Sequence, residues 1–123
     1  DVEDALAAVN VGADAIVVSN HGGRQLDGAM SSITALPAIV EAIGNRAEVW
    51  MDGGIRSGQD VLRAIALGAK GTMIGRAFLY GLGAKGQAGV RQTLEIIHKE
   101  LDLTLGLCGQ SDLAKVDSSI LLK

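Results

Sequence analysis

Apolar residues alternate between two patterns along this chain, one typical of buried strands and one typical of amphipathic helices. Short, nearly continuous apolar runs occur at residues 14–20, 48–52 and 71–75. Their length and composition favour strands that are buried on both faces, as in a parallel sheet. Each run therefore predicts one strand.

Helical spacing of apolar residues separates these runs. One apolar helix face is expected from Ile33, Leu36, Ile39, Val40 and Ile43. The next is expected from Val61, Leu62, Ile65 and Ala66, with Gly68 where a helix C-terminal glycine belongs. Residues 1–9 and about 89–107 also have helical patterns, and residues 111–123 predict a short helix plus a turn.

This order of elements predicts an α/β fold with parallel strands and crossover helices. The strings Val-Gly-Ala-Asp-Ala (11–15) and Leu-Gly-Ala-Lys-Gly (67–71) indicate two copies of one helix-to-strand turn. Three parallel strands alone would leave two edges and an apolar face exposed. A (β/α)8 TIM barrel, usually about 250 residues long, would cover them. We therefore expect residues 1–123 to be the C-terminal part of a single barrel domain, roughly its last three βα units, with an N-terminal barrel segment missing.

Composition and charge exclude some classes of function. The chain is 48% hydrophobic, which predicts a packed core, and its net charge of −3 with scattered basic residues argues against a nucleic-acid partner. The single cysteine, Cys108, excludes an internal disulfide and is expected to pack as a small apolar residue. His98 is expected on a solvated helix face, and no metal-ligand cluster is seen.

Glycine and arginine follow the second and third predicted strands, in residues 52–58 and 75–77. Glycines let a backbone approach an anion closely, and Arg56 and Arg76 could each donate forked hydrogen bonds to phosphate. These segments therefore predict a phosphate site, of the kind that barrels form after strands 7 and 8. The alternative is two ordinary glycine-rich turns with surface arginines.

A histidine and an arginine follow the first predicted strand. Imidazole ordinarily titrates near pH 6.5, about the right value for a base at neutral pH, so His21 is a candidate base. Arg24 could bind a carboxylate through two parallel hydrogen bonds. The pair would suit proton removal beside a carboxylate. The alternative is a structural, hydrogen-bonded histidine.

Three motifs together resemble the FMN-dependent α-hydroxy-acid oxidases and dehydrogenases, a family that includes glycolate oxidase, lactate oxidase and mandelate dehydrogenase. They are Ser-Asn-His-Gly-Gly-Arg-Gln-Leu-Asp (19–27), Asp-Gly-Gly-Ile-Arg-Ser-Gly (52–58) and Gly-Arg-Ala-Phe-Leu-Tyr-Gly (75–81). The first is highly specific to this family. The second resembles phosphate loops of IMP dehydrogenase and type 2 isopentenyl-diphosphate isomerase as well.

The resemblance implies a role for each matching residue. His21 would be the catalytic base, Arg24 would bind the substrate carboxylate, and Ser19 would contact the flavin. The residues that would hold the ribityl and phosphate part of FMN are Asp52, Gly53, Gly54, Ile55, Arg56, Gly75 and Arg76. The implied reaction oxidises an L-2-hydroxy acid, such as lactate or glycolate, to the 2-oxo acid and passes two electrons to FMN. Whether His21 takes the hydroxyl proton or the α-carbon proton stays open.

The resemblance also implies features that this chain does not carry. A lysine near the flavin, an aspartate that orients the histidine, and tyrosines near the substrate come from upstream segments in the family. The chain alone is therefore expected to be catalytically silent, and the whole protein to be a homotetramer that is cytoplasmic or membrane-peripheral. Its sequence ends in Ile-Leu-Leu-Lys, without a peroxisomal signal.

Two other function classes stay open at this point. One is a barrel enzyme that acts on a phosphorylated ligand, of the IMP dehydrogenase or isopentenyl-diphosphate isomerase kind. The other is a non-catalytic half-barrel. The particular hydroxy acid, and the choice of oxygen, a quinone or a cytochrome as electron acceptor, are not determined by the sequence.

Overall fold

The structure, a computed structural model, describes residues 1–121. Residues 122 and 123, the end of the expected C-terminal tail, lie outside the described part. In chain order the elements are α1 (Val2–Asn10), β1 (Ala15–Val18), the 3₁₀ helix η1 (His21–Gly23), α2 (Ser32–Ile43), β2 (Glu48–Met51), α3 (Gly58–Ala66), β3 (Gly71–Thr72), α4 (Arg76–Leu107), and the 3₁₀ helices η2 (Leu113–Lys115) and η3 (Ser118–Ile120).

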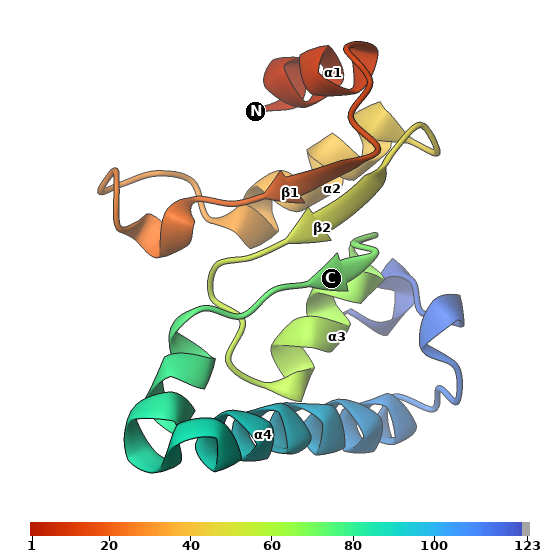
Figure 1. Cartoon of the computed structure of the whole chain (residues 1–123). Helices are drawn as coiled ribbons and strands as arrows, with labels where there is room; N and C mark the ends of the chain where they lie inside the picture. Colours follow the sequence, from red (N-terminus) through yellow and green to blue (C-terminus); the bar gives the residue numbers. More distant parts are fainter. Residues whose placement is uncertain (122–123) are drawn as a thin grey trace.

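The three strands form one parallel sheet in the order β1-β2-β3. Val17 pairs with Trp50, and Trp50 pairs with Gly71 in the next strand. The predicted α/β order is confirmed. Because the strands are parallel, their carboxyl ends lie on the same side of the molecule, where the loop after β1 and the start of α4 also lie (Figure 1).

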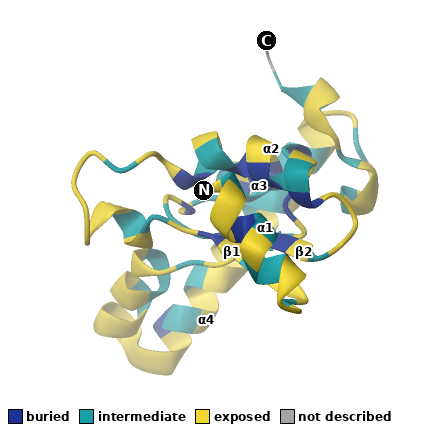
Figure 2. Ribbon diagram, turned by 90° about the horizontal axis from the view of Figure 1, so that it is seen from above, coloured by how far each residue is buried: buried dark blue, intermediate teal, exposed yellow. Residues whose placement is uncertain are grey.

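The core lies between one face of the sheet and its helices. Leu36, Ile39 and Ile43 of α2 are buried against Val49 and Met51 of β2, as the helical spacing predicts. The buried positions gather where α1, α2 and the strands meet, whereas most of α4 is exposed (Figure 2). The helix α4 packs on α3. The main core cluster thus contains no residue of α4.

One face of the sheet is open within residues 1–121. An exposed apolar face is what the sequence predicts for three parallel strands without the rest of a barrel. Ala15 and Val17 of β1 are exposed, the latter by 44%. The helices cover only one face of the sheet, so alternate side chains of each strand remain open to solvent. The strands are also shorter than predicted, and β3 pairs with β2 alone.

The two predicted helix-to-strand turns share one geometry. Gly12 and Gly68 have φ of +103° and +97°. The next residue of each turn, Ala13 or Ala69, donates its backbone N–H to the carbonyl oxygen five residues back. This is the Schellman ending of a helix, in which glycine accepts the left-handed backbone conformation. The internal repeat read from the sequence is therefore confirmed.

The C-terminal third differs from its prediction in detail. Backbone angles break α4 at Lys85 and Gly86, so a short helix over 76–84 precedes the predicted long one. His98 is exposed, as predicted. Cys108 is exposed too, so the prediction that it packs as an apolar residue is wrong: it directly follows α4, whose last turn lies at the surface.

Two 3₁₀ helices, η2 and η3, occupy the described part of the tail where one short helix was expected. Across residues 1–121, no helix has both the length and the apolar composition needed to cross a membrane.

The first residue of α3 crosses α4 at close range. Gly58 is buried, and a Cβ atom built there would overlap the backbone of Leu101. The backbone N–H of Gly58 donates to the Glu100 carboxylate at 3.0 Å. This contact joins residues 42 positions apart and sets the distance between the two helices.

We expect Gly58→Ala to destabilise the protein by about 2–3 kcal/mol, because an added methyl would push α3 away from α4. Gly106→Ala is the matched control, since Gly106 also lies in a helix but has open space around it. That change should raise the free energy of unfolding by about 0.5–1 kcal/mol, because alanine lowers the backbone entropy of the unfolded chain. Urea unfolding of both variants measures the difference, and equal stabilities would contradict the close crossing.

Candidate functional site

A cleft of about 580 Å³ lies at the carboxyl ends of the strands. The loops after β1, β2 and β3 form its walls together with the start of α4. The predicted site residues that line it are His21, Arg24, Asp52, Gly53, Gly54, Ile55, Arg56, Gly75 and Arg76. Ser19 is the one predicted residue outside the lining. The fold thus brings three separate sequence motifs to one place.

The loop after β1 holds His21 in an unusual backbone conformation. His21 has φ of +54°, the left-handed region that side chains other than glycine seldom adopt. Its backbone N–H donates to Ser19 Oγ at 3.1 Å, and the N–H of Gly23 donates to the Asn20 carbonyl oxygen at 3.0 Å. Strain of this kind, held by surrounding hydrogen bonds, is often found at functional sites.

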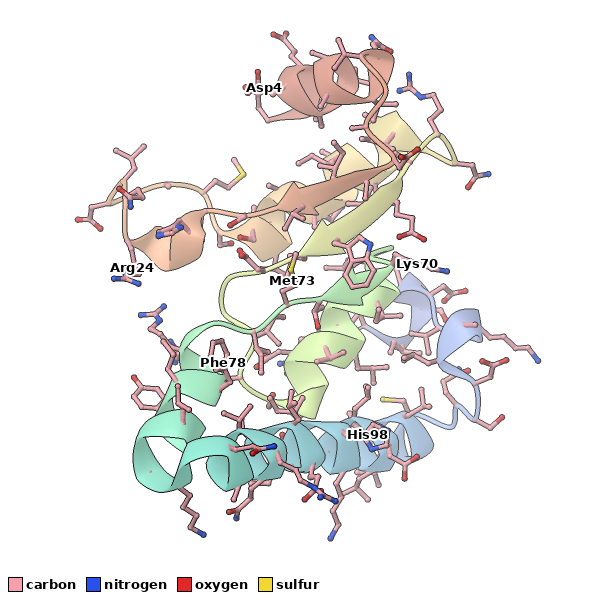
Figure 3. All side chains as sticks on the ribbon, in the orientation of Figure 1. Asp4, Arg24, Lys70, Met73, Phe78 and His98 are labelled. Carbon is pink, nitrogen blue, oxygen red and sulfur yellow. The ribbon has the colours of Figure 1, made fainter. Side chains whose placement is uncertain are left out.

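The side chains of His21 and Arg24 are free for a ligand. Within residues 1–121, neither the imidazole of His21 nor the guanidinium of Arg24 makes a hydrogen bond or an ion pair. Figure 3 shows Arg24 reaching from the loop toward the first turn of α4, which contains Phe78. A structural, hydrogen-bonded histidine, the alternative interpretation of His21, has no support within the described residues.

A carboxylate oxygen without a partner lies in the loop after β2. Asp52 donates its backbone N–H to the Val18 carbonyl oxygen at 3.1 Å, which fixes it at the end of the strand. Its Oδ1 atom is buried and accepts no hydrogen bond from residues 1–121. Buried polar atoms are nearly always paired, so this oxygen suits a donor supplied by a ligand, such as a hydroxyl group.

Two neighbouring helices differ in whether their N-termini are already satisfied. At α3, the Asp60 carboxylate accepts from the backbone N–H groups of Arg56 and Ser57, both at 3.1 Å, and Glu100 accepts from Gly58. At α4, no side chain caps the helix at Gly75. The free N–H groups and the positive end of the helix dipole are therefore at α4, where they favour an anion.

Two arginines flank the uncapped N-terminus of α4. Arg56 makes no side-chain hydrogen bond or ion pair within residues 1–121. Arg76 donates from Nη2 to the Gly22 carbonyl oxygen at 3.3 Å, which links the start of α4 to the loop after β1. Their guanidinium groups and the helix N-terminus make this end of the cleft suitable for phosphate.

The apolar part of the cleft lining was not assigned a role from the sequence. The lining residues without a predicted role include Met73, Ile74, Phe78, Leu79 and Tyr80. The glycine-arginine pair at 75–76 could have indicated them, because the chain directly before and after it lies along the same cleft. Among residues 1–121, no group of three or more histidine, cysteine, aspartate and glutamate side chains could hold a metal ion.

Known proteins resemble the chain over its whole length. A profile of the FMN-dependent dehydrogenases matches residues 1–123. An L-lactate dehydrogenase from Caulobacter sp. is 58% identical over 123 residues, which is 100% of this chain and 32% of the relative. An L-lactate oxidase from Nostoc sp. is 53% identical over 119 residues, which is 97% of this chain and 33% of the relative. The chain thus spans about a third of the length of these relatives.

Solved structures of mandelate oxidase share the fold. One that holds a monooxide FMN adduct has a TM-score of 0.88 and 53% sequence identity, covering 92% of this chain and 36% of that one. Another, with benzoyl-formic acid, has a TM-score of 0.89 and 53% identity, covering 92% and 34%. These neighbours are TIM barrels, so the predicted fold class is confirmed, and this chain contributes three βα units of such a barrel.

We expect inorganic phosphate to bind the ligand-free protein at the start of α4. Arg76→Ala should weaken this binding about tenfold or more, because a hydrogen bond to a charged group contributes about 1.5–3 kcal/mol. Arg91→Ala is the matched control, since Arg91 is exposed and pairs with Glu95 away from the cleft. Isothermal titration calorimetry measures both affinities. Equal weakening by the two changes would place the phosphate elsewhere.

Proposed function

Because this chain belongs to the FMN-dependent dehydrogenase family, we propose that it is the flavin-phosphate-binding and base-carrying part of a 2-hydroxy-acid oxidase or dehydrogenase. The observation that carries the proposal is the cleft. It gathers His21 and three guanidinium groups, none of which is paired with a carboxylate within residues 1–121. Such a site suits a ligand that brings its own negative charges.

The residues present fit FMN. Arg56, Arg76 and the uncapped N-terminus of α4 would hold its phosphate, with Gly75 at the turn. The unpartnered Oδ1 of Asp52 would accept a hydrogen bond from a ribityl hydroxyl. Gly53, Gly54 and Ile55 belong to the same wall of the cleft. Ser19 would act through its hydrogen bond to His21 and through a flavin contact.

The chain's own residues would bind and deprotonate the substrate. The Arg24 guanidinium would bind the carboxylate and so place the hydroxyl-bearing carbon near His21. The imidazole of His21 would accept one proton as the 2-hydroxy acid becomes the 2-oxo acid. Bound FMN would supply the acceptor for the two electrons and the remaining proton that the substrate loses. The hydrogen bond from the His21 backbone to Ser19 supports the left-handed conformation and would help to keep the base in place before the substrate arrives.

The substrate class follows from the relatives' names as a proposal. The relatives include L-lactate dehydrogenases and an L-lactate oxidase, and the solved neighbours are mandelate oxidases. All of these names refer to 2-hydroxy acids, so we take an L-2-hydroxy acid as the substrate and L-lactate as the first to test. We also propose that the chain is the C-terminal part of one barrel domain, and that the rest of the barrel completes the active site.

The full-length protein that contains this chain should contain FMN, and its visible flavin absorbance should bleach when L-lactate, glycolate or (S)-mandelate is added without oxygen. Bleaching follows from transfer of two electrons to the flavin. Bound flavin that no 2-hydroxy acid reduces would instead favour a barrel enzyme for a phosphorylated ligand. Protein that neither contains nor binds FMN would favour a non-catalytic half-barrel.

We expect His21→Asn to lower the rate of flavin reduction about 10²–10⁴-fold, the usual contribution of a general base. Asparagine is suitable because it tolerates the left-handed backbone of this position better than most residues. The control is His98→Asn, which changes the other histidine, an exposed residue of α4. Stopped-flow absorbance measures both rates. A variant at residue 21 that reduces flavin normally would exclude His21 as the base.

A further inference from the structure

We propose that Asn20 and Ser32 form a clasp that fixes the loop carrying His21 and Arg24, and that Ser32 is a positioning residue for the reaction. The clasp consists of two hydrogen bonds. The backbone N–H of Asn20 donates to Ser32 Oγ at 3.2 Å, and Asn20 Nδ2 donates to the Met30 carbonyl oxygen at 3.3 Å. This inference rests on the proposed function for its catalytic consequence.

The clasp closes the loop at its base. The loop leaves β1 just before Asn20 and returns at the start of α2, where Ser32 lies. Ser32 is only 4% exposed, and it is the one buried polar residue within residues 1–121. A buried hydroxyl that accepts a backbone hydrogen bond from the other end of a loop holds both ends in register. Both predicted reactive side chains lie between those ends.

The rest of the loop has little else to hold it. Its other backbone hydrogen bonds are local, between Gly23 and Asn20, Arg24 and His21, and Ala29 and Leu26. Residues 23–28 are all exposed. The one other hydrogen bond from the loop to a distant part of the chain within residues 1–121 joins Arg76 Nη2 to the Gly22 carbonyl oxygen at 3.3 Å. The base of the loop is therefore its main anchor.

The clasp also supports the loop after β2. A Cβ atom built on Gly53 would lie 2.9 Å from Ser32 Oγ and 3.0 Å from Asn20 Oδ1. The backbone of Gly53 therefore passes directly over both side chains, next to Asp52 in the wall of the cleft. The segment with the base and the segment with the unpartnered carboxylate share one support, so a shift of the clasp would move them together.

Helix capping does not account for the Ser32 hydroxyl. The N-cap residue of α2 is Ser31, whose hydroxyl pairs with Thr34 Oγ1 at 2.6 Å. Ser32 follows it and directs its oxygen to Asn20 instead. The hydroxyl of Ser32 is therefore used for the loop, and Thr34 offers a matched control at the same helix N-terminus, outside the cleft lining.

The test uses the full-length holoenzyme with Ser32→Ala, Ser32→Thr, Asn20→Ala and Thr34→Ala. We expect Ser32→Ala to lower kcat per bound flavin about tenfold, and Ser32→Thr, which keeps the hydroxyl, to restore it to within about threefold. Asn20→Ala, which removes the bond to Met30 alone, should give a smaller loss. Thr34→Ala should leave kcat as in the unchanged enzyme.

Hydrogen–deuterium exchange of residues 20–31 gives a readout that does not depend on activity. Ser32→Ala should raise their exchange, while Thr34→Ala should not.

Unchanged exchange in Ser32→Ala would overturn the clasp. Raised exchange with unchanged kcat per flavin, or with a kcat that threonine does not restore, would overturn the positioning role. If Ser32→Ala does not fold, the same two measurements on Ser32→Cys, whose thiol is a weaker hydrogen-bond acceptor, decide. An unchanged holoenzyme that reduces no flavin with any 2-hydroxy acid would refute the proposed function, and the positioning role with it, whereas the exchange result would still judge the clasp.

Discussion

The parallel alignment of the three strands is the constraint on which the rest of the structure depends. Because β1, β2 and β3 run in the same direction, each one delivers the segment that follows it to the same edge of the sheet. His21, Asp52 and Arg76 are far apart in sequence, yet they line one cleft for this reason. The buried face between α2 and β2 keeps the strands in register. The site is therefore a consequence of topology before it is a consequence of any single side chain.

At this edge some hydrogen-bonding and charged groups are already paired within the described chain and others are not. The unpaired groups are the ones that can bind a ligand. The N-terminus of α3 is neutralised by Asp60 and Glu100, so it has little left to offer an anion. The N-terminus of α4 has no side-chain cap and lies beside Arg76. In the same cleft, the buried Oδ1 atom of Asp52 accepts no hydrogen bond from residues 1–121. Hydrogen-bonding groups left unsatisfied within the described chain thus mark where a phosphate and a polyhydroxyl ligand would be stabilised.

The same sheet that gathers the site leaves its other face open. Val17 is exposed on that face, and Trp50, its partner in β2, lies across Gly71 of β3. In a closed barrel such side chains form the packed interior, supplied by all eight strands. The chain spans about a third of the length of its relatives, and its three βα units make up a corresponding part of the barrel. Within residues 1–121 the groups that suit a phosphate, Arg56, Arg76 and the N-terminus of α4, lie in one cleft, and the His21 imidazole makes no hydrogen bond.

Features that depend on local sequence patterns could be predicted, whereas features that depend on contacts between distant segments could not. Apolar periodicity predicted the strands and the buried face of α2, and a repeated short string predicted the glycine turns at Gly12 and Gly68. Each of these depends on residues a few positions apart. The motifs also predicted the lining of the cleft, apart from its apolar residues.

Three features could not be predicted, since each depends on segments distant in sequence. They are the clasp at Ser32, the cap that Glu100 provides to α3 and the unpartnered oxygen of Asp52. Exposure of Cys108 was missed for the same reason. The sequence by itself determined which elements form and which chemical groups end each strand; only the tertiary structure decided which of those groups are satisfied, because hydrogen-bond partners and burial are set by packing between distant segments.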